Sequence, residues 1–338
     1  MTTKNEPLKI LQEEDGMRLD RWFKMHYPDL KFGQLQKLLR SGQIRLDGGR
    51  VKASARIEMG QFVRVPPSVL HAGDSDSKEV PKAKFISAKD RDYLKSLILH
   101  QDDRILVINK PCGLAVQGGT GQTRNLDDML IGLQFKASSK PRLVHRLDKD
   151  TSGVLILARD RQAAAHMAAE MKARRTHKLY WALTCGVPRP LDGEVENRIE
   201  KSGPKGAEKM KSAEMMHEAE EPEVSGQRAI TRYQVIDQAA NKFAWVAMQP
   251  VTGRTHQLRV HASLMDCPIT GDGKYGGRDA HPGGDISPKL HLHARAITFT
   301  HPNGKKLTVE APMPDHMEKT WAMLGFETAG VEDPFDEE

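Results

Sequence analysis

The side chains best suited to chemistry are concentrated in one ten-residue segment, Val144–Gly153 (VHRLDKDTSG). The apolar run that follows it, Val154–Ala158, predicts a buried strand. A carboxylate at the mouth of such a strand, here Asp148, is held rigidly within reach of a substrate, as a nucleophile or general base requires. A salt bridge within a surface loop is the ordinary alternative. The residue types of this segment alone leave both interpretations open.

Composition and charge restrict the class of protein. The 338 residues carry a formal net charge of +6, which favours an anionic partner. Cys112, Cys185 and Cys267 lie far apart, which argues against a disulfide framework or a cysteine zinc site. The first residues lack the apolar core of a signal peptide, and no run approaches the roughly 20 apolar residues of a membrane span. We therefore expect a cytoplasmic protein with no membrane partner.

Residues 17–66 predict a small basic module of two helices and short strands. Apolar side chains repeat at helical spacing over residues 19–26 and 35–39, and strand-like runs follow on either side of the Asp47-Gly48-Gly49 turn. From Met17 to Arg64 there are eleven lysines and arginines against four acidic residues. These cations form either a solvated face or an RNA-binding surface. Those that lie off the apolar positions are Arg18, Arg21, Lys24, Lys37 and Arg40.

Polar stretches divide the rest of the chain. Residues 1–16 are expected to be an N-terminal extension, and residues 67–89 a linker that is poor in large apolar side chains. A catalytic domain is expected over residues 90–326, and residues 201–228 are expected to be a polar surface excursion within it. Residues 327–338 are expected to be a disordered acidic tail.

Strand-like runs dominate the large domain. Helical patterns are fewer, chiefly residues 161–172 and a segment after Thr255. This balance predicts an α+β domain built on a mostly antiparallel mixed sheet. The strand-like runs are residues 105–108, 154–158, 179–184, 230–236, 243–248, 296–300 and 307–309.

Five segments, in order along the chain, resemble the RluA-type pseudouridine synthase family. Residues 17 to about 66 likewise resemble the alpha-L RNA-binding module of a ribosomal protein and of several RNA-modifying enzymes. The five segments are Asn109–Val116 (NKPCGLAV), His145–Gly153 (HRLDKDTSG), His177–Leu183 (HKLYWAL), Val251–Gly276 (VTGRTHQLRVH to PITGDGKYG), and Leu290–Ala294 (LHLHA) with Phe299–Pro302 (FTHP).

The resemblance implies an enzyme that breaks the bond between uracil and ribose, turns the base in the pocket and rejoins it through carbon. It implies no cofactor and no metal. Asp148 takes the role of nucleophile or base, and Arg259 takes that of the cation that pairs with it. Arg254 is a less favoured candidate for that cation.

The resemblance also implies roles in binding the nucleotide. Tyr180 stacks on the uracil, and its part as a base or only as a platform stays open. Arg146 fills the space left when the nucleotide leaves its stack, which offsets part of the cost of extrusion. Leu290 lines the pocket under the base, with Leu292 as the alternative.

The leading expectation is a monomeric pseudouridine synthase acting on large-subunit ribosomal RNA. The Ala115–Gly121 segment resembles the RluC-type branch, although Gln117 stands where that branch usually has histidine. The alternatives are a non-enzymatic RNA-binding ribosome-assembly factor, a synthase acting on transfer RNA, and a glycosidic-bond hydrolase. A zinc site is not expected, because no acidic or cysteine ligand completes a set with the nearby histidines. Those histidines are His256, His261, His291 and His293.

Overall fold

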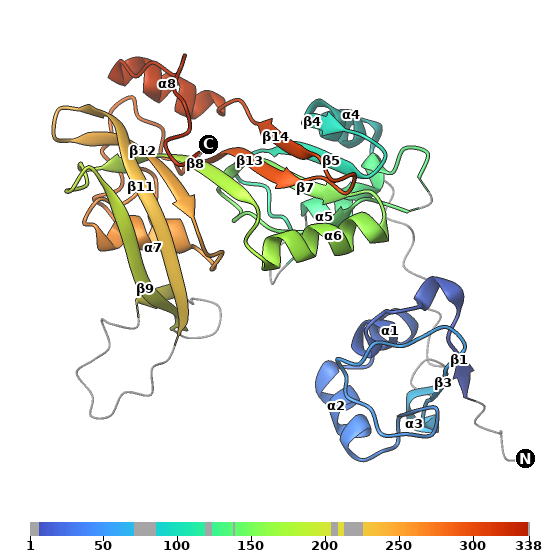
Figure 1. The fold of residues 1–338 in the computed structure, drawn as a ribbon. Coiled ribbons are helices and arrows are strands. Elements are labelled where there is room, and N and C mark those ends of the chain that lie inside the picture. The colour runs from blue at the N-terminus through green and yellow to red at the C-terminus, as the bar shows by residue number, and fades with distance from the viewer. Residues whose placement is uncertain are drawn as a thin grey trace, which may run out of the picture. The chain divides into compact units, whose positions relative to one another are not determined.

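The chain forms two compact units, residues 1–83 and residues 84–338. The computed structural model describes residues 7–70, 86–118, 124–137, 139–203, 209–212 and 226–336 (Figure 1). Within these ranges, no helix combines the length and the apolar character needed to cross a membrane.

The N-terminal unit packs two helices and a three-stranded antiparallel sheet around one core. Helix α1 (Leu19–His26) and helix α2 (Phe32–Arg40) are the two amphipathic helices predicted by apolar spacing. Trp22 and Phe23 of α1 are buried with Leu35 and Leu39 of α2 and with Val63 of the sheet. The strands, in sheet order, are β1 (Leu8–Lys9), β3 (Phe62–Arg64) and β2 (Arg45–Leu46).

This unit extends beyond both expected boundaries of the module, residues 17 and 66. Strand β1 pairs with β3, and Ile10 is buried in the core, so the folded module takes in residues that were expected to form an extension. A short helix, α3 (Pro67–Leu70), follows β3 within the stretch expected to be a linker. Residues 71–85 of that stretch lie outside the described residues.

The C-terminal unit is built on an eleven-stranded mixed sheet. Neighbouring strands are antiparallel except for β7 and β13, which are parallel. The predicted α+β class with a mostly antiparallel sheet is confirmed. The strands, in sheet order, are β10 (Lys209–Ser212), β9 (Asp192–Ser202), β11 (Gln227–Ala239), β12 (Phe243–Pro250), β8 (His177–Cys185), β13 (Leu292–Thr300), β7 (Ser152–Ala158), β5 (Ile105–Lys110) and β4 (Ile98–Gln101), with β14 (Lys306–Glu310) on β13 and β6 (Arg142–Leu143) on β7.

The helices of this unit connect and cover the strands. Helix α6 spans the predicted range, and the Asp160 carboxylate caps its N-terminus by accepting a 2.9 Å hydrogen bond from the Ala163 N–H. Helix α7 is the segment expected after Thr255. The helices are α4 (Ala88–Ser96), α5 (Leu126–Met129), α6 (Arg161–Lys172), α7 (Gln257–Leu264) and α8 (Asp315–Leu324), with a 3-10 turn at Leu130–Leu133.

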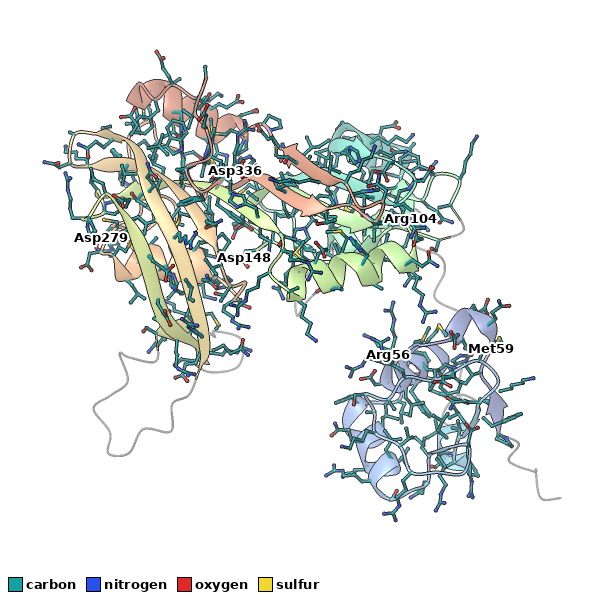
Figure 2. All side chains as sticks on the ribbon, viewed as in Figure 1. Arg56, Met59, Arg104, Asp148, Asp279 and Asp336 are labelled. Atoms are coloured by element: carbon teal, nitrogen blue, oxygen red, sulfur yellow. The ribbon has the colours of Figure 1, made fainter. Side chains whose placement is uncertain are left out.

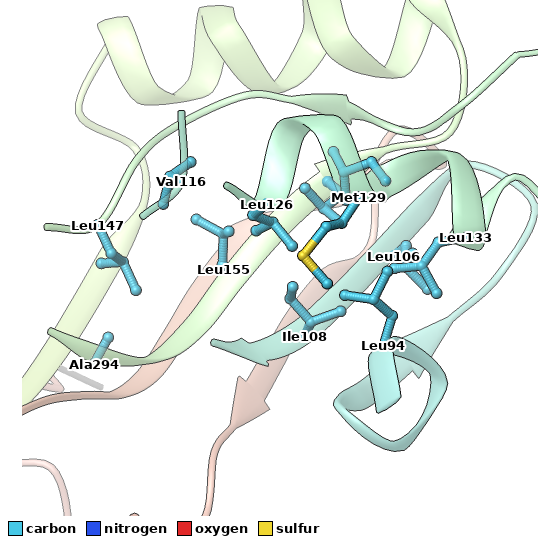
Figure 3. Close-up of a cluster of buried hydrophobic side chains, with 12 residues drawn as sticks. Leu94, Leu106, Ile108, Val116, Leu126, Met129, Leu133, Leu147, Leu155 and Ala294 are labelled. Carbon is cyan, nitrogen blue, oxygen red and sulfur yellow. The ribbon is translucent and has the colours of Figure 1, made fainter. Parts of the chain in front are cut away.

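Strand β7 is buried along its whole length because apolar clusters cover both of its faces. Leu155 and Leu157 pack on one face with Leu106 and Ile108 of β5. Leu147, the residue before Asp148, belongs to this same cluster (Figure 3). Packing of Leu147 therefore anchors the loop that carries the candidate carboxylate.

A second core packs α8 against strands β8 and β12. Trp245 contacts Trp181 edge to face, with ring centroids 4.8 Å apart, and Trp321 of α8 at 5.8 Å. Val331 and Phe335 pack against this aromatic cluster. The expectation of a disordered tail was therefore wrong for residues 327–336, because these two apolar side chains anchor a segment that is otherwise acidic.

Candidate active site

A buried lysine fixes the loop that carries Asp148. The ammonium of Lys110, at the end of β5, donates hydrogen bonds to the backbone oxygens of Pro111, Leu114 and Lys149, at 2.9, 2.9 and 3.0 Å. Burial lowers the pKa of Lys110 to about 8. Because Lys149 directly follows Asp148, these bonds tie the candidate carboxylate to the loop after β5.

A glycine lets β7 approach β13 closely just after this loop. Gly153 has a φ of +112°, and a Cβ atom there would lie 2.2 Å from the backbone oxygen of Ala294. The neighbouring Ser152 hydroxyl is 2.9 Å from Nδ1 of the buried His293. The Thr-Ser-Gly end of the segment thus joins two central strands and sets the direction in which the loop leaves them.

His145, at the start of the segment, has a structural position. The Ile156 N–H donates to its Nε2 at 2.9 Å. Burial, with a smaller contribution from the charge of Lys178, lowers the pKa of His145 to about 3, so the ring is neutral at physiological pH.

A cavity of about 760 Å³ opens beside Asp148. Figure 2 shows Asp148 between the two halves of the sheet, whereas Asp279 lies at the outer edge of the unit. Asp148 is the only carboxylate among the described residues that line this cavity, and the other charged groups there are basic. They are Arg146, Lys172, Arg174, Arg175, Lys178, Arg232, Arg254 and Arg259, with His145, His177 and His256 as titratable neighbours.

Arg259 lies between two carboxylates. Its Nε and Nη2 atoms donate to both oxygens of Asp272 at 2.8 and 2.7 Å, and its Nη1 atom lies 3.9 Å from Oδ2 of Asp148. Burial alone would lower the pKa of Arg259, but the hydrogen bonds and charge of Asp272 outweigh it and raise the pKa. The sequence led us to expect Asp148 as its partner, whereas the hydrogen-bonded partner is Asp272.

His256 is a neighbour of Asp148 that sequence reasoning did not assign to the site. Its Nε2 atom lies 3.8 Å from Oδ2 of Asp148, and its Nδ1 atom lies 2.6 Å from the hydroxyl oxygen of Tyr275. It stands three residues before Arg259 in the GRTHQLR segment, and this closeness in sequence was the signal that could have assigned His256 to the site. Asp272 and Tyr275 belong to the matching GDGKYG segment but carried no individual signal in the sequence.

Of the remaining residues predicted to form the pocket, Tyr180 and Arg146 line the cavity, whereas Leu290 does not. Tyr180 is half-buried in the cavity wall, and burial together with the charge of Asp148 raises its pKa, so the phenol keeps its proton at neutral pH. Arg146 is exposed and lines the same cavity, as does Arg254. Leu292 also lines the cavity, whereas Leu290 is not among the lining residues and is buried in the core beneath β12 and α7.

Comparison with known proteins identifies the family of this chain. Residues 104–264 match the family model described as RNA pseudouridylate synthase. The chain is 36% identical to the "Ribosomal large subunit pseudouridine synthase C" of Rickettsia felis, over 88% of this chain and 93% of that protein. It is 33% identical to the protein of the same name from Vibrio vulnificus, over 94% and 96%. This chain belongs to the pseudouridine synthase family.

A solved pseudouridine synthase structure extends the likeness to the fold. The human "RNA Pseudouridylate Synthase Domain Containing 4" is 32% identical, with a TM-score of 0.57, and the match covers 71% of this chain and 98% of that one. The matched family region, residues 104–264, contains Asp148, Tyr180 and Arg259.

The N-terminal basic residues lie outside the region matched to the synthase family. All five are exposed, four of them on the two helices of the N-terminal unit and one just before α1: they are Arg18, Arg21, Lys24, Lys37 and Arg40. Arg18, just before α1, forms an ion pair with Asp20 at 2.6 Å. The spacing of three residues places Arg21 with Lys24 on one side of α1, and Lys37 with Arg40 on one side of α2.

Proposed function

We propose that this chain isomerises specific uridines to pseudouridine in large-subunit ribosomal RNA, with Asp148 as the nucleophile or base. The observation that carries the proposal is that Asp148 is the single carboxylate among the described residues lining an otherwise basic cavity, with its Oδ2 atom 3.9 Å from Nη1 of the buried Arg259. The names of the relatives support the RNA class. We also propose that it acts as a cytoplasmic monomer.

The reaction is an isomerisation that needs no external oxidant, reductant or hydrolytic water. The bond from ribose C1′ to uracil N1 breaks, a bond from C1′ to C5 forms, the proton on C5 is lost and N1 gains one. The Asp148 side chain acts as nucleophile or as base in this sequence of steps. The arginines and lysines around the cavity neutralise the phosphates of the bound strand.

The other predicted side chains handle the nucleotide. Arg146, at the exposed edge of the cavity, fills the space left by the extruded uridine. Tyr180 stacks on the base, and its raised pKa favours a protonated hydroxyl over a phenolate base. Leu292 lines the pocket under the base in place of Leu290.

A genetic experiment tests the assigned carboxylate. Pseudouridines are mapped in ribosomal and transfer RNA from cells that lack the gene and from cells complemented with wild type, Asp148→Ala or Asp150→Ala. We expect sites in large-subunit RNA to vanish on deletion and to return with wild type and with Asp150→Ala, a change in an exposed residue of the same loop. Return of every site with Asp148→Ala would disprove the role of Asp148.

The same experiment separates two of the alternatives, and an assay for free uracil separates the third. Loss of sites only in transfer RNA would indicate a transfer-RNA synthase, and an unchanged map together with defective ribosome assembly would indicate a non-enzymatic factor. A hydrolase predicts free uracil in a reaction with purified RNA, whereas an isomerase releases none.

A further inference from the structure

Strand β10 reaches the candidate site through a tyrosine. It lies within the polar 201–228 stretch, which the reaction described above does not use. The backbone N–H of Met210 in β10 donates a 3.1 Å hydrogen bond to the hydroxyl oxygen of Tyr275. The ring of Tyr275 lies under the guanidinium of Arg259, with 5.1 Å between Cζ and the ring centroid. Tyr275 therefore joins the excursion to a residue already beside Asp148.

The hydrogen-bond partners of Tyr275 assign a tautomer to His256. Its hydroxyl oxygen accepts from Met210, so its own proton needs an acceptor, and Nδ1 of His256 at 2.6 Å is the acceptor that the described part of the chain provides. With Nδ1 accepting, a neutral His256 carries its proton on Nε2. That N–H is on the side of the ring that faces Asp148.

Burial favours the neutral form of His256. Burial lowers its pKa more than the neighbouring charge of Asp148 raises it, and among the smaller charge effects Arg259 and Lys274 lower the pKa while Asp272 raises it. His256 thus offers Asp148 a neutral N–H donor beside the positive charge of Arg259.

Both donors approach the same carboxylate oxygen. Nε2 of His256 and Nη1 of Arg259 lie 3.8 and 3.9 Å from Oδ2 of Asp148. These distances are slightly longer than hydrogen bonds, and such contacts commonly shorten when substrate binds. His256 also has a left-handed backbone, with φ +56°, which is unusual for a non-glycine residue and is found often at functional sites.

We propose that His256 is a positioning residue, and that β10, Tyr275 and His256 form a hydrogen-bond chain that directs Nε2–H of His256 toward Oδ2 of Asp148 and leaves Oδ1 to meet the uridine. This inference rests on the proposed function. It gives the 201–228 excursion a task, because its strand supplies the first donor of the chain.

A spectroscopic experiment tests the hydrogen-bond chain without requiring catalysis. Long-range ¹H–¹⁵N spectra of the full chain with labelled histidine assign the His256 signals by their loss in His256→Gln. We expect the Nε2–H tautomer in wild type and a shifted Nδ1 resonance in Tyr275→Phe, which removes one hydroxyl. An Nδ1–H tautomer in wild type, or an unchanged Nδ1 resonance in Tyr275→Phe, overturns the proposal.

Single-turnover pseudouridine formation tests the consequence for the reaction. We expect Tyr275→Phe and His256→Ala to slow the step about 10- to 100-fold with RNA affinity within about twofold, as misplacement of a reacting group does. His256→Gln, whose amide N–H can replace Nε2–H, recovers part of the rate and removes the loss of rate that protonation of His256 causes in wild type at acidic pH. His281→Gln, a change in an exposed histidine, is the matched control and keeps the wild-type rate and pH profile.

The outcomes of the two proposals are distinguishable. An active wild type with Tyr275→Phe and His256→Ala at the wild-type rate contradicts only this inference. An inactive wild type contradicts the proposed function, and the ¹⁵N spectra then decide whether the hydrogen-bond chain exists. If His256→Ala does not fold, Tyr275→Phe carries the kinetic test.

Discussion

Arg259 donates two hydrogen bonds to Asp272, at 2.7 and 2.8 Å, and this fixes the guanidinium whose third nitrogen faces Asp148. The two side chains are both buried, and a two-point contact of this kind fixes the orientation of an arginine as well as its charge. The cation beside the candidate nucleophile is therefore oriented by a second carboxylate.

Asp272→Asn tests this arrangement. The amide cannot accept from both guanidinium nitrogens, so Arg259 is left poorly oriented, and we expect single-turnover pseudouridine formation to fall about 10- to 100-fold. RNA binding, measured by filter retention, changes little. Asp279→Asn, at an exposed site of the same connection, serves as the control. A wild-type rate in folded Asp272→Asn contradicts the positioning role of Asp272.

Lys110→Met tests the buried ammonium that holds the loop carrying Asp148. The change leaves three backbone oxygens without their charged donor, so we expect the free energy of unfolding to fall by about 2–4 kcal/mol, together with activity. Urea denaturation followed by circular dichroism measures the loss. Lys149→Met changes an exposed side chain of the same loop and should leave stability within about 0.5 kcal/mol.

We expect acid to destabilise the C-terminal unit through its buried histidines. Burial lowers the pKa of His145 to about 3 and the pKa values of His261, His291 and His293 to about 4. The unfolded chain takes up these protons below about pH 6.5, and the folded chain does so only near the lowered values. The free energy of unfolding therefore falls as pH drops from about 6.5 toward 4, by up to ~1.4 kcal/mol per pH unit for each histidine.

Urea midpoints at pH 7.5, 6.0 and 5.0 check this slope. We expect a progressive fall below pH 6.5, and His281→Gln, at an exposed site, to leave the slope unchanged. Equal midpoints at pH 7.5 and 5.0 would show that the folded chain protonates these histidines as readily as the unfolded chain does.

The salt dependence of RNA binding tests whether the basic faces of α1 and α2 contact phosphates. Each phosphate-contacting cation that is removed reduces the slope of log affinity against log salt by about 0.7–0.9. We expect Arg21→Ala and Lys37→Ala each to weaken RNA binding and to flatten this slope, measured by filter retention from 50 to 200 mM salt. Lys52→Ala, exposed in a loop outside the two helices, is the control. An unchanged slope in both helix variants argues against phosphate contacts there.

The acidic C-terminal segment contributes stability through its apolar residues. Phe335 packs against the aromatic cluster, and Asp333 contacts His177 at 2.7 Å. We expect Phe335→Ala to lower the free energy of unfolding by about 1–2 kcal/mol because the side chain is only half-buried. Thermal unfolding measures the shift, and Glu332→Ala, at an exposed site, should leave it unchanged.

The fold was predictable where one face of an element is apolar. The spacing of Leu19, Trp22 and Phe23 predicted α1, and the continuous run Val154–Ala158 predicted β7. Strand β9 was not predicted because it is mostly polar and charged, with Val195 and Ile199 as its only apolar side chains, and it is ordered by pairing with β11 and β10. Packing of Val331 and Phe335 against a cluster that includes Trp181 and Trp245, far away in the sequence, could not be predicted from the local composition either.

The candidate site was predictable only as a set of residue types. The segment with Asp148 and the segment with Arg259 could be named, and the cavity includes both. The partner of Arg259 could not be deduced, because a close approach of residues 259 and 272 depends on the turn between α7 and β13. The contact from Met210 to Tyr275 depends on strand pairing across a polar stretch, for which hydrophobic periodicity gives no signal.

The placement of the tryptophans gives each unit its own optical signal. Three of the four in the chain, Trp181, Trp245 and Trp321, form one cluster in the C-terminal unit, and Trp22 is buried in the other unit. Emission from Trp22→Phe protein therefore reports only the C-terminal unit, and the difference from wild type reports the N-terminal one. Intrinsic fluorescence can thus determine whether the N-terminal unit melts before, with or after the unit that carries Asp148.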